Sequence, residues 1–234
     1  MKRSFEISIG GAVMLVEIIF QPNADAACTN TSPINSNTTI TCSGANTPSV
    51  TAPTTSTNVT IDLDPSTAAS FVHSTNAVAF SVDHASTITN SGNFSLTGGG
   101  TGTARGAVLL GATNDNQLTN TASGIISTTG AFNDGMAANG SGNTLTNNGR
   151  ITTAGPNAYG MTAAWGQTNS GQLNNTIVNT GSVSTSGSNA RAASILGGNG
   201  LINNSGTLST TGSGSPAAYM QGNNDSLINT GSIS

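Results

Sequence analysis

Apolar and polar residues alternate along this chain in short segments, and the segments recur at regular intervals. From residue 88 onward, each segment has a period of two residues and is bounded by Gly, Asn, Ser or Pro, which is typical of a β-strand. The stretches between them lack the 3.6-residue period of an amphipathic helix. The pattern therefore predicts an all-β protein built from many short strands.

The apolar positions align in three columns when the repeats are written one below another. The first column contains Ile88, Leu118, Leu145, Ile177, Leu201 and Leu227. The second column contains Phe94, Ile126, Ile151, Val183, Leu208 and Ile233. The third contains the pairs Ala107/Leu109, Met136/Ala138, Met161/Ala163, Ala193/Ile195 and Ala218/Met220. Three strands per repeat predict a parallel β-helix solenoid of about seven coils.

A short sequence motif, an Asn followed within four residues by a Gly, occurs six times beside these columns. Its glycines recur at intervals of 25 or 32 residues, which sets the length of one coil. Both residue types tolerate the left-handed backbone of a tight corner. We expect the side-chain amides to stack as a structural Asn ladder formed by Asn90, Asn120, Asn147, Asn179, Asn203 and Asn229.

The repeat pattern leaves two places where a binding surface could lie. Extra residues between Ala163 and Ile177, around Trp165, are predicted to loop out because the columns on both sides stay aligned. The position before each third strand forms an outward column of Arg105, Asp134, Tyr159, Arg191 and Pro216. This column predicts an exposed Arg105–Asp134 ion pair and a Tyr159–Arg191 cation–π contact, each worth at most about 1 kcal/mol. With Trp165 it is a candidate interaction surface, the alternative being surface decoration without a ligand.

Residues 1–26 have the organisation of an export signal. A basic start precedes a mostly apolar stretch from Ile7 to Phe20, which is shorter than the roughly 20 residues of a membrane span. A small-x-small cleavage pattern follows at residues 24–26, although the acidic Glu6 and Glu17 are atypical of such signals. We therefore predict cleavage after Ala26.

The mature chain then divides into two parts. Residues 27–58 are rich in Thr, Asn, Ser and Pro and predict an irregular N-terminal cap, while residues 59–234 predict the β-helix. Cys28 and Cys42 are the only cysteines, and an exported chain is expected to join them in a disulfide.

The amino-acid composition limits the classes of partner that the protein could bind. Only 6% of residues are charged and the net charge is −4. After residue 26 the cations are Arg105, Arg150 and Arg191, too few for a nucleic-acid surface. There is no CxxC motif, and the two histidines are not spaced as a ligand set with the cysteines, so we expect no metal and no cofactor.

The carboxylates of the mature chain are also too scattered to predict paired acid/base chemistry. They are Asp62, Asp64, Asp83, Asp115, Asp134 and Asp225. Paired glycosidase carboxylates lie about 5–9.5 Å apart. Asp115 and Asp225 share a turn position but are expected four coils apart, about 19 Å at 4.8 Å per coil, and Asp134 lies on a different turn. We expect no catalytic residues and no enzyme.

The segments Ala27-Cys28 and Thr41-Cys42-Ser43-Gly44 after the export signal, and Leu-Thr-Asn-Asn-Gly-Arg-Ile-Thr-Thr at 145–153, resemble the passenger region of bacterial autotransporters. The resemblance covers essentially the whole chain. It implies a right-handed β-helix, export across the inner membrane, and display at the cell surface or outer membrane, or release, for adhesion to a receptor or glycan. It also implies a β-barrel translocator, which this chain does not encode. The chain is therefore expected to be truncated at its C-terminal end, and to be periplasmic if no translocator is available.

A second function remains open at this stage. Solenoids of this kind also form polysaccharide-binding or polysaccharide-cleaving proteins. A groove that gathers two or more of the aspartates would favour the enzyme, and its absence would favour the non-catalytic surface protein.

Overall fold

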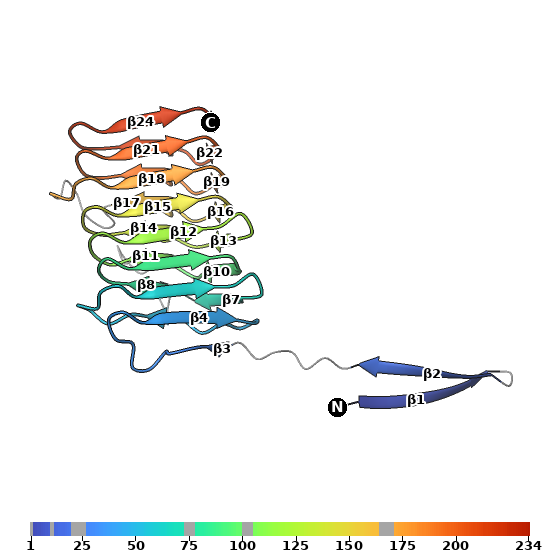
Figure 1. Ribbon diagram of the computed structural model, residues 1–234. Coiled ribbons are helices and arrows are strands. Elements are labelled where there is room, and N and C mark those ends of the chain that lie inside the picture. The colour runs from blue at the N-terminus through green and yellow to red at the C-terminus, as the bar shows by residue number, and fades with distance from the viewer. Residues whose placement is uncertain (1, 10–11, 20–26, 73–77, 100–104, 164–170) are drawn as a thin grey trace.

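A computed structural model describes residues 2–9, 12–19, 27–72, 78–99, 105–163 and 171–234. The protein is an all-β solenoid in which parallel strands stack along one axis (Figure 1). Three strands per coil form three separate sheets, and the stack amounts to about six turns. The predicted fold class, an all-β parallel solenoid with three strands per coil, is confirmed, whereas the predicted number of about seven coils was too high.

The first apolar column forms sheet 1, which has nine strands within the described residues. Its members are parallel except that β3 runs antiparallel to β4. The strands are β3 (Ala27–Cys28), β4 (Thr39–Ser43), β6 (Thr60–Leu63), β9 (Thr87–Asn90), β12 (Gln117–Asn120), β15 (Thr144–Asn147), β18 (Thr176–Asn179), β21 (Leu201–Asn204) and β24 (Ser226–Asn229).

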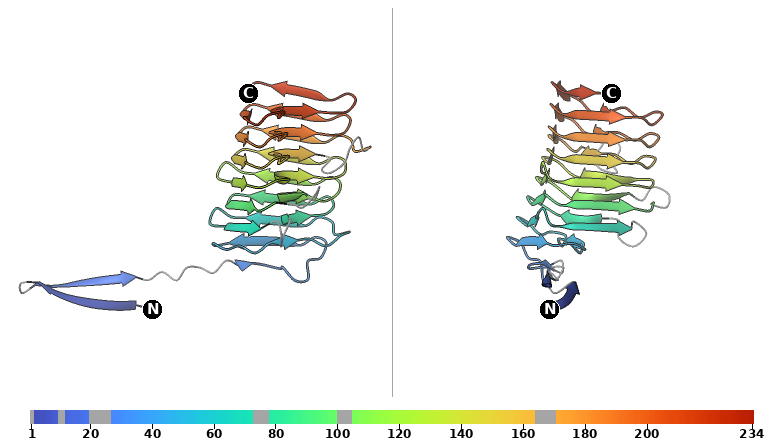
Figure 2. Two further views of the ribbon diagram at one scale, coloured as in Figure 1. Left: turned by 180° about the vertical axis from the view of Figure 1, so that it is seen from behind. Right: turned by 90° about the vertical axis from the view of Figure 1, so that its right-hand side faces the viewer.

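The second and third columns form sheets 2 and 3, with seven strands each in the described chain. Sheet 2 contains β7 (Ala68–Val72), β10 (Asn93–Thr97), β13 (Ile125–Thr128), β16 (Arg150–Thr153), β19 (Ser182–Thr185), β22 (Thr207–Thr210) and β25 (Ser232–Ile233). Sheet 3 contains β5 (Val50–Thr51), β8 (Val78–Val82), β11 (Gly106–Gly111), β14 (Asn133–Ala138), β17 (Met161–Ala163), β20 (Ala193–Ile195) and β23 (Ala218–Met220). Two further views show the coils as parallel rungs of one stack (Figure 2).

The core is a column of apolar side chains enclosed by the three sheets. The second predicted column is confirmed in full, since Phe94, Ile126 and Ile151 pair in sequence and the pairing continues to Ile233. In the first column the prediction was wrong at one position, because Ile202 rather than Leu201 pairs with Ile177. Leu and Ile are adjacent there, so alternation alone leaves a one-residue shift undecided, and packing selects the residue that faces inward.

The third column was wrong by two residues at its start. Leu109, not Ala107, lies opposite Met136, and Met136 lies opposite Met161. The period-two pattern fails here because β11 does not alternate strictly: Leu109 belongs to the core, whereas Ala107 packs in a separate cluster with Leu110 and Ala137. The larger Leu109 fills the core position, where it is fully buried.

The Asn ladder runs through the core side of the turn between sheets 1 and 2. Each amide nitrogen except the last donates to the amide oxygen of the next coil at 2.7–2.8 Å. Asn204, not the predicted Asn203, occupies the fifth position, because the strand alternates and Asn203 faces outward. The members are Asn90, Asn120, Asn147, Asn179, Asn204 and Asn229. The first five are completely buried.

The glycines that follow the ladder are required by close stacking and not by a left-handed corner. None of the six has a positive φ. A Cβ on Gly181 would lie 2.1 Å from the carbonyl oxygen of Gly149, and a Cβ on Gly206 equally close to that of Gly181. The sequence analysis therefore gave the wrong reason for these glycines. They are needed because the preceding coil leaves no room for a side chain, and not because the corner has a left-handed backbone.

A second ladder, which the sequence analysis missed, lies at the start of the sheet 1 strands. The side-chain oxygens of Asn116, Asn143 and Asn175 each accept a backbone N–H from the preceding coil at 2.9–3.1 Å. These residues stand two positions before the first apolar column, so their recurrence was visible in the sequence. Both ladders satisfy buried polar groups that would otherwise destabilise a stack of turns.

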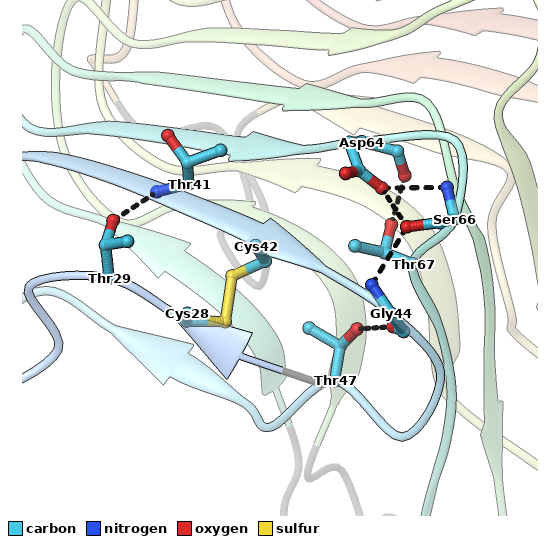
Figure 3. The surroundings of a disulfide bond; sticks show 9 residues. All are labelled: Cys28, Thr29, Thr41, Cys42, Gly44, Thr47, Asp64, Ser66 and Thr67. Carbon is cyan, nitrogen blue, oxygen red and sulfur yellow. Dashed lines mark hydrogen bonds between the residues drawn. A yellow bond between two sulfur atoms is a disulfide. The ribbon is translucent and has the colours of Figure 1, made fainter. Parts of the chain in front are cut away.

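The segment 27–58 is more regular than an irregular cap, because β4 and β5 join sheets 1 and 3. A disulfide links Cys28 on β3 to Cys42 on β4 and holds the antiparallel strand against the first parallel one (Figure 3). Farther upstream, β1 (Lys2–Ile9) and β2 (Ala12–Ile19) pair only with each other among the described strands. The proposed cleavage site after Ala26 lies outside the described residues, and the export signal stays a prediction.

Candidate functional site: the arginine–aromatic column

Six side chains form one continuous column that we call the arginine–aromatic column. It runs along the solenoid axis beside sheet 3, with its members just before or on β11, β14, β17, β20 and β23. Adjacent coils are hydrogen-bonded in register, so residues from different repeats become neighbours about one strand spacing apart. The members are Arg105, Phe132, Asp134, Tyr159, Arg191 and Tyr219.

The first part of the column is a bidentate ion pair. Arg105 donates from Nε to Asp134 Oδ2 at 3.0 Å and from Nη2 to Asp134 Oδ1 at 2.6 Å. The Asp134 side chain is fully buried and that of Arg105 is 14% exposed, so the expectation of an exposed pair was wrong. Asp134 lies opposite Ala107 in the sheet, and Arg105 reaches it from the turn ahead of β11. Breaking a buried pair is more costly than breaking a surface pair, because the remaining charge is left uncompensated away from water.

The remaining contacts explain why a carboxylate is stable in this position. Asp134 Oδ1 also accepts the backbone N–H of Tyr159 at 2.7 Å, and Arg105 Nη2 donates to the carbonyl of Asn157 at 3.0 Å. Burial alone would lower the pKa of the Arg105 guanidinium, but the charge and hydrogen bonds of Asp134 outweigh it, and the pKa lies above its ordinary value. At this end of the column, the charged groups of Arg105 and Asp134 therefore have their hydrogen-bond partners within the protein.

The second part of the column alternates arginine with tyrosine. The Arg105 guanidinium lies 4.3 Å from the centre of the Tyr159 ring. The Arg191 guanidinium lies 5.2 Å from the Tyr159 ring and 3.5 Å from the Tyr219 ring. These distances are within the roughly 6 Å range of cation–π attraction. Tyr219, which the sequence analysis did not include, takes the place expected for Pro216.

Tyr219 was missed because it does not stand one residue before its strand. It lies on β23 and pairs with Ser194 in sheet 3, and from there its ring reaches Arg191. Tyr219 stands one coil length after Ser194, so its place in sheet 3 could have been inferred from the sequence. The alternation of apolar and polar residues permits this alignment but does not select it over others.

Phe132 is the second residue that the sequence analysis missed, and its backbone is unusual. It adopts φ of 61°, a left-handed conformation that is costly for a bulky side chain. The aligned residues of later coils are Asn157, Asn189 and Gly214, which tolerate this conformation. Its half-buried ring lies 5.8 Å from the Arg105 guanidinium. An aromatic residue is thus held at a position where the backbone favours Asn or Gly.

A groove adjoins the far end of the column. It has a volume of about 530 Å³ and is lined by turn residues of three successive coils, including Leu173, Asn199, Gln221 and Asn224. The Tyr219 hydroxyl and the Gln221 Oε1 are hydrogen-bonded at 2.9 Å, which connects the groove to the column. The lining is neutral, and its polar groups are amides and backbone.

The carboxylates are distributed among separate roles. Neither this groove nor a second one of about 410 Å³ beside β7 and β10 is lined by an aspartate. Asp134 binds Arg105, and Asp225 Oδ1 accepts the N–H of Gly200 at 2.7 Å. In the part of the chain that the structure describes, no three His, Cys, Asp or Glu residues are grouped so that they could hold a metal ion. The criterion that would favour a polysaccharide-cleaving enzyme is not met in these two grooves.

Trp165, which was predicted to lie near the column, is outside the described residues. Within those residues, no helix is long and apolar enough to cross a membrane. No protein-family model, curated protein or solved structure matches this chain.

Proposed function

We propose that this protein is an exported, non-catalytic β-solenoid of the autotransporter-passenger type that presents surfaces for adhesion or interaction with other cells. The observation that carries the proposal is the arginine–aromatic column. Two of the three arginines beyond residue 26 and both tyrosines of the chain gather in it, although only 6% of all residues are charged and 4% aromatic. Arg and Tyr are enriched at binding hot spots.

The rest of the solenoid suits a presenting role. Both ladders and the core use the inward side chains, so the sheets form a stiff support whose outward positions are free to vary. A site on rigid strands holds its side chains more accurately than a site on a loop. The column can therefore act as a preformed contact surface, with little entropy lost on binding.

The experiment has two arms. Full-length chain expressed in a Gram-negative host should lose residues 1–26, as read by the mass of the exported product. Beads coated with that product should bind cultured epithelial cells more strongly than beads coated with an unrelated protein. A double variant, Arg191→Gln with Tyr219→Ala, should reduce the binding several-fold. The control Arg150→Gln removes the same charge from the exposed face of β16 and should not.

Equal binding by both kinds of bead would contradict the proposal. The second candidate, a polysaccharide-binding or polysaccharide-cleaving protein, is favoured only by the groove beside Tyr219. Release of reducing ends from a panel of soluble polysaccharides would establish cleavage and replace the proposal.

A further inference from the structure

Arg191 differs from the other arginine of the column in how few partners it has. Arg105 makes two hydrogen bonds to Asp134 and one to the Asn157 carbonyl. The side chain of Arg191 makes one hydrogen bond within the described chain, from Nη1 to the Ser194 hydroxyl at 3.2 Å, and has no carboxylate within ion-pair range there. A guanidinium carries five N–H donors, so most of the donors of Arg191 have no acceptor among the described residues.

The surroundings of Arg191 also fix its orientation. Tyr159 belongs to the coil before it and Tyr219 to the coil after it, and the guanidinium lies between the two rings. A tyrosine ring therefore lies within cation–π range of the guanidinium on each side along the axis, while most of its N–H donors make no hydrogen bond to the described residues. Guanidinium edges bind carboxylates through two parallel N–H···O bonds. The pair Arg105–Asp134 shows this geometry one step earlier in the column, with the acceptor supplied by the protein itself.

The charge distribution limits the kind of anion. The charge of Arg105 in the same column is balanced by Asp134, and the net charge of the chain is −4, so Arg191 does not belong to the continuous basic surface that a nucleic acid needs. The neighbouring groove offers neutral amides, from Asn199, Gln221 and Asn224, which suit hydroxyl and acetamido groups. Its volume of about 530 Å³ is in the range of ligand sites, roughly 300–1,000 Å³.

We propose that Arg191, held between Tyr159 and Tyr219, binds the carboxylate of an acidic saccharide, and that the adjoining groove accommodates the neighbouring neutral sugar. This assignment rests on the proposed function and names the class of ligand that the column recognises. The carboxylate accepts two N–H bonds from the guanidinium edge. The amides beside Tyr219 bind the neutral sugar. The hydrogen-bonded Tyr219–Gln221 pair lies where the groove meets the arginine–aromatic column.

The test is calorimetric titration of the full chain with a hyaluronan hexasaccharide, in which a carboxylate-bearing sugar alternates with a neutral acetamido sugar. The carboxyl-reduced hexasaccharide is the matched ligand control. We expect the acidic form to bind and carboxyl reduction to weaken it at least about tenfold, the effect of one charge-assisted hydrogen bond. Arg191→Gln should weaken binding by a similar factor and abolish the preference for the acidic form, whereas Arg150→Gln should leave both unchanged.

Three results would overturn the assignment. They are equal binding of the two hexasaccharides, unchanged binding by Arg191→Gln, and tighter binding of an acidic peptide or inorganic phosphate than of the hexasaccharide. A thermal unfolding curve of Arg191→Gln matching the wild type shows that its loss of binding is not loss of fold. If the cell-binding assay succeeds but the hexasaccharides are not distinguished, the proposed function stands and only the ligand assignment fails.

Discussion

The Asn ladder can be tested at its centre by replacing Asn147 with Asp, which keeps the shape of the side chain and removes its donor. Asn147 accepts from Asn120 at 2.8 Å and donates to Asn179 at 2.8 Å, and it is completely buried. A carboxylate there would face the amide oxygen of Asn179 and lose weaker bonds to the carbonyls of Gly149 and Ser182. An unsatisfied buried polar group costs about 1–3 kcal/mol, and a charged one more.

The expected loss for Asn147→Asp at neutral pH is therefore about 2–4 kcal/mol in the free energy of unfolding. The adjacent Asn148→Asp is the control, because Asn148 is exposed and its side chain only accepts from Thr180 at 2.8 Å. It should change stability by less than about 0.5 kcal/mol. Guanidinium unfolding followed by circular dichroism measures both, and hydrogen exchange at the neighbouring coils shows whether the loss is local.

The pH dependence distinguishes a lost donor from a general packing defect. When protonated, the introduced carboxyl can donate to Asn179, and burial raises its pKa in the folded state. Both states are protonated below the unfolded pKa of about 3.9, so the penalty is smallest there. It grows as pH rises from that value through the raised folded pKa. A difference between Asn147→Asp and the wild type that stays constant between pH 3 and pH 7 would refute the ladder as the source of stability.

Three other substitutions follow from the structure. Asp134→Asn should cost about 3–5 kcal/mol in unfolding free energy, because it leaves Arg105 charged and mostly buried, whereas loss of less than 1 kcal/mol would show that the pair is solvated. Gly181→Ala should destabilise by about 1–3 kcal/mol through contact with the Gly149 carbonyl, and an unchanged unfolding midpoint would show that the coils can separate there. Phe132→Asn should be neutral or stabilising by up to about 1 kcal/mol, since Asn accepts its left-handed backbone, and a clear loss of stability would show that ring packing outweighs the strain.

The architecture could be predicted from the sequence because every coil repeats the same alternation. Phe94, Ile126 and Val183 each follow a Gly by two residues, and each faces the core of sheet 2. A period of two fixes which side chains face inward, and the repeat length fixes how many strands form one coil. These properties are local, so the sequence alone determined the all-β class, the three sheets and nearly all of the core.

What the tertiary structure decided is the register between coils and its consequences. Alternation does not distinguish Asn203 from Asn204 where two asparagines adjoin. It also does not show that Leu109 enters the core while Ala107, two residues earlier, packs in a separate cluster with Leu110. The candidate site depends on the same register, since Tyr219 reaches Arg191 only because the two coils stack. Asp134, whose burial turns a surface ion pair into a structural one, likewise acquires its partners Tyr159 and Arg105 from 25 and 29 residues away in the chain. One coil's sequence specifies its own faces, whereas side chains in neighbouring coils acquire their partners only when the coils pack.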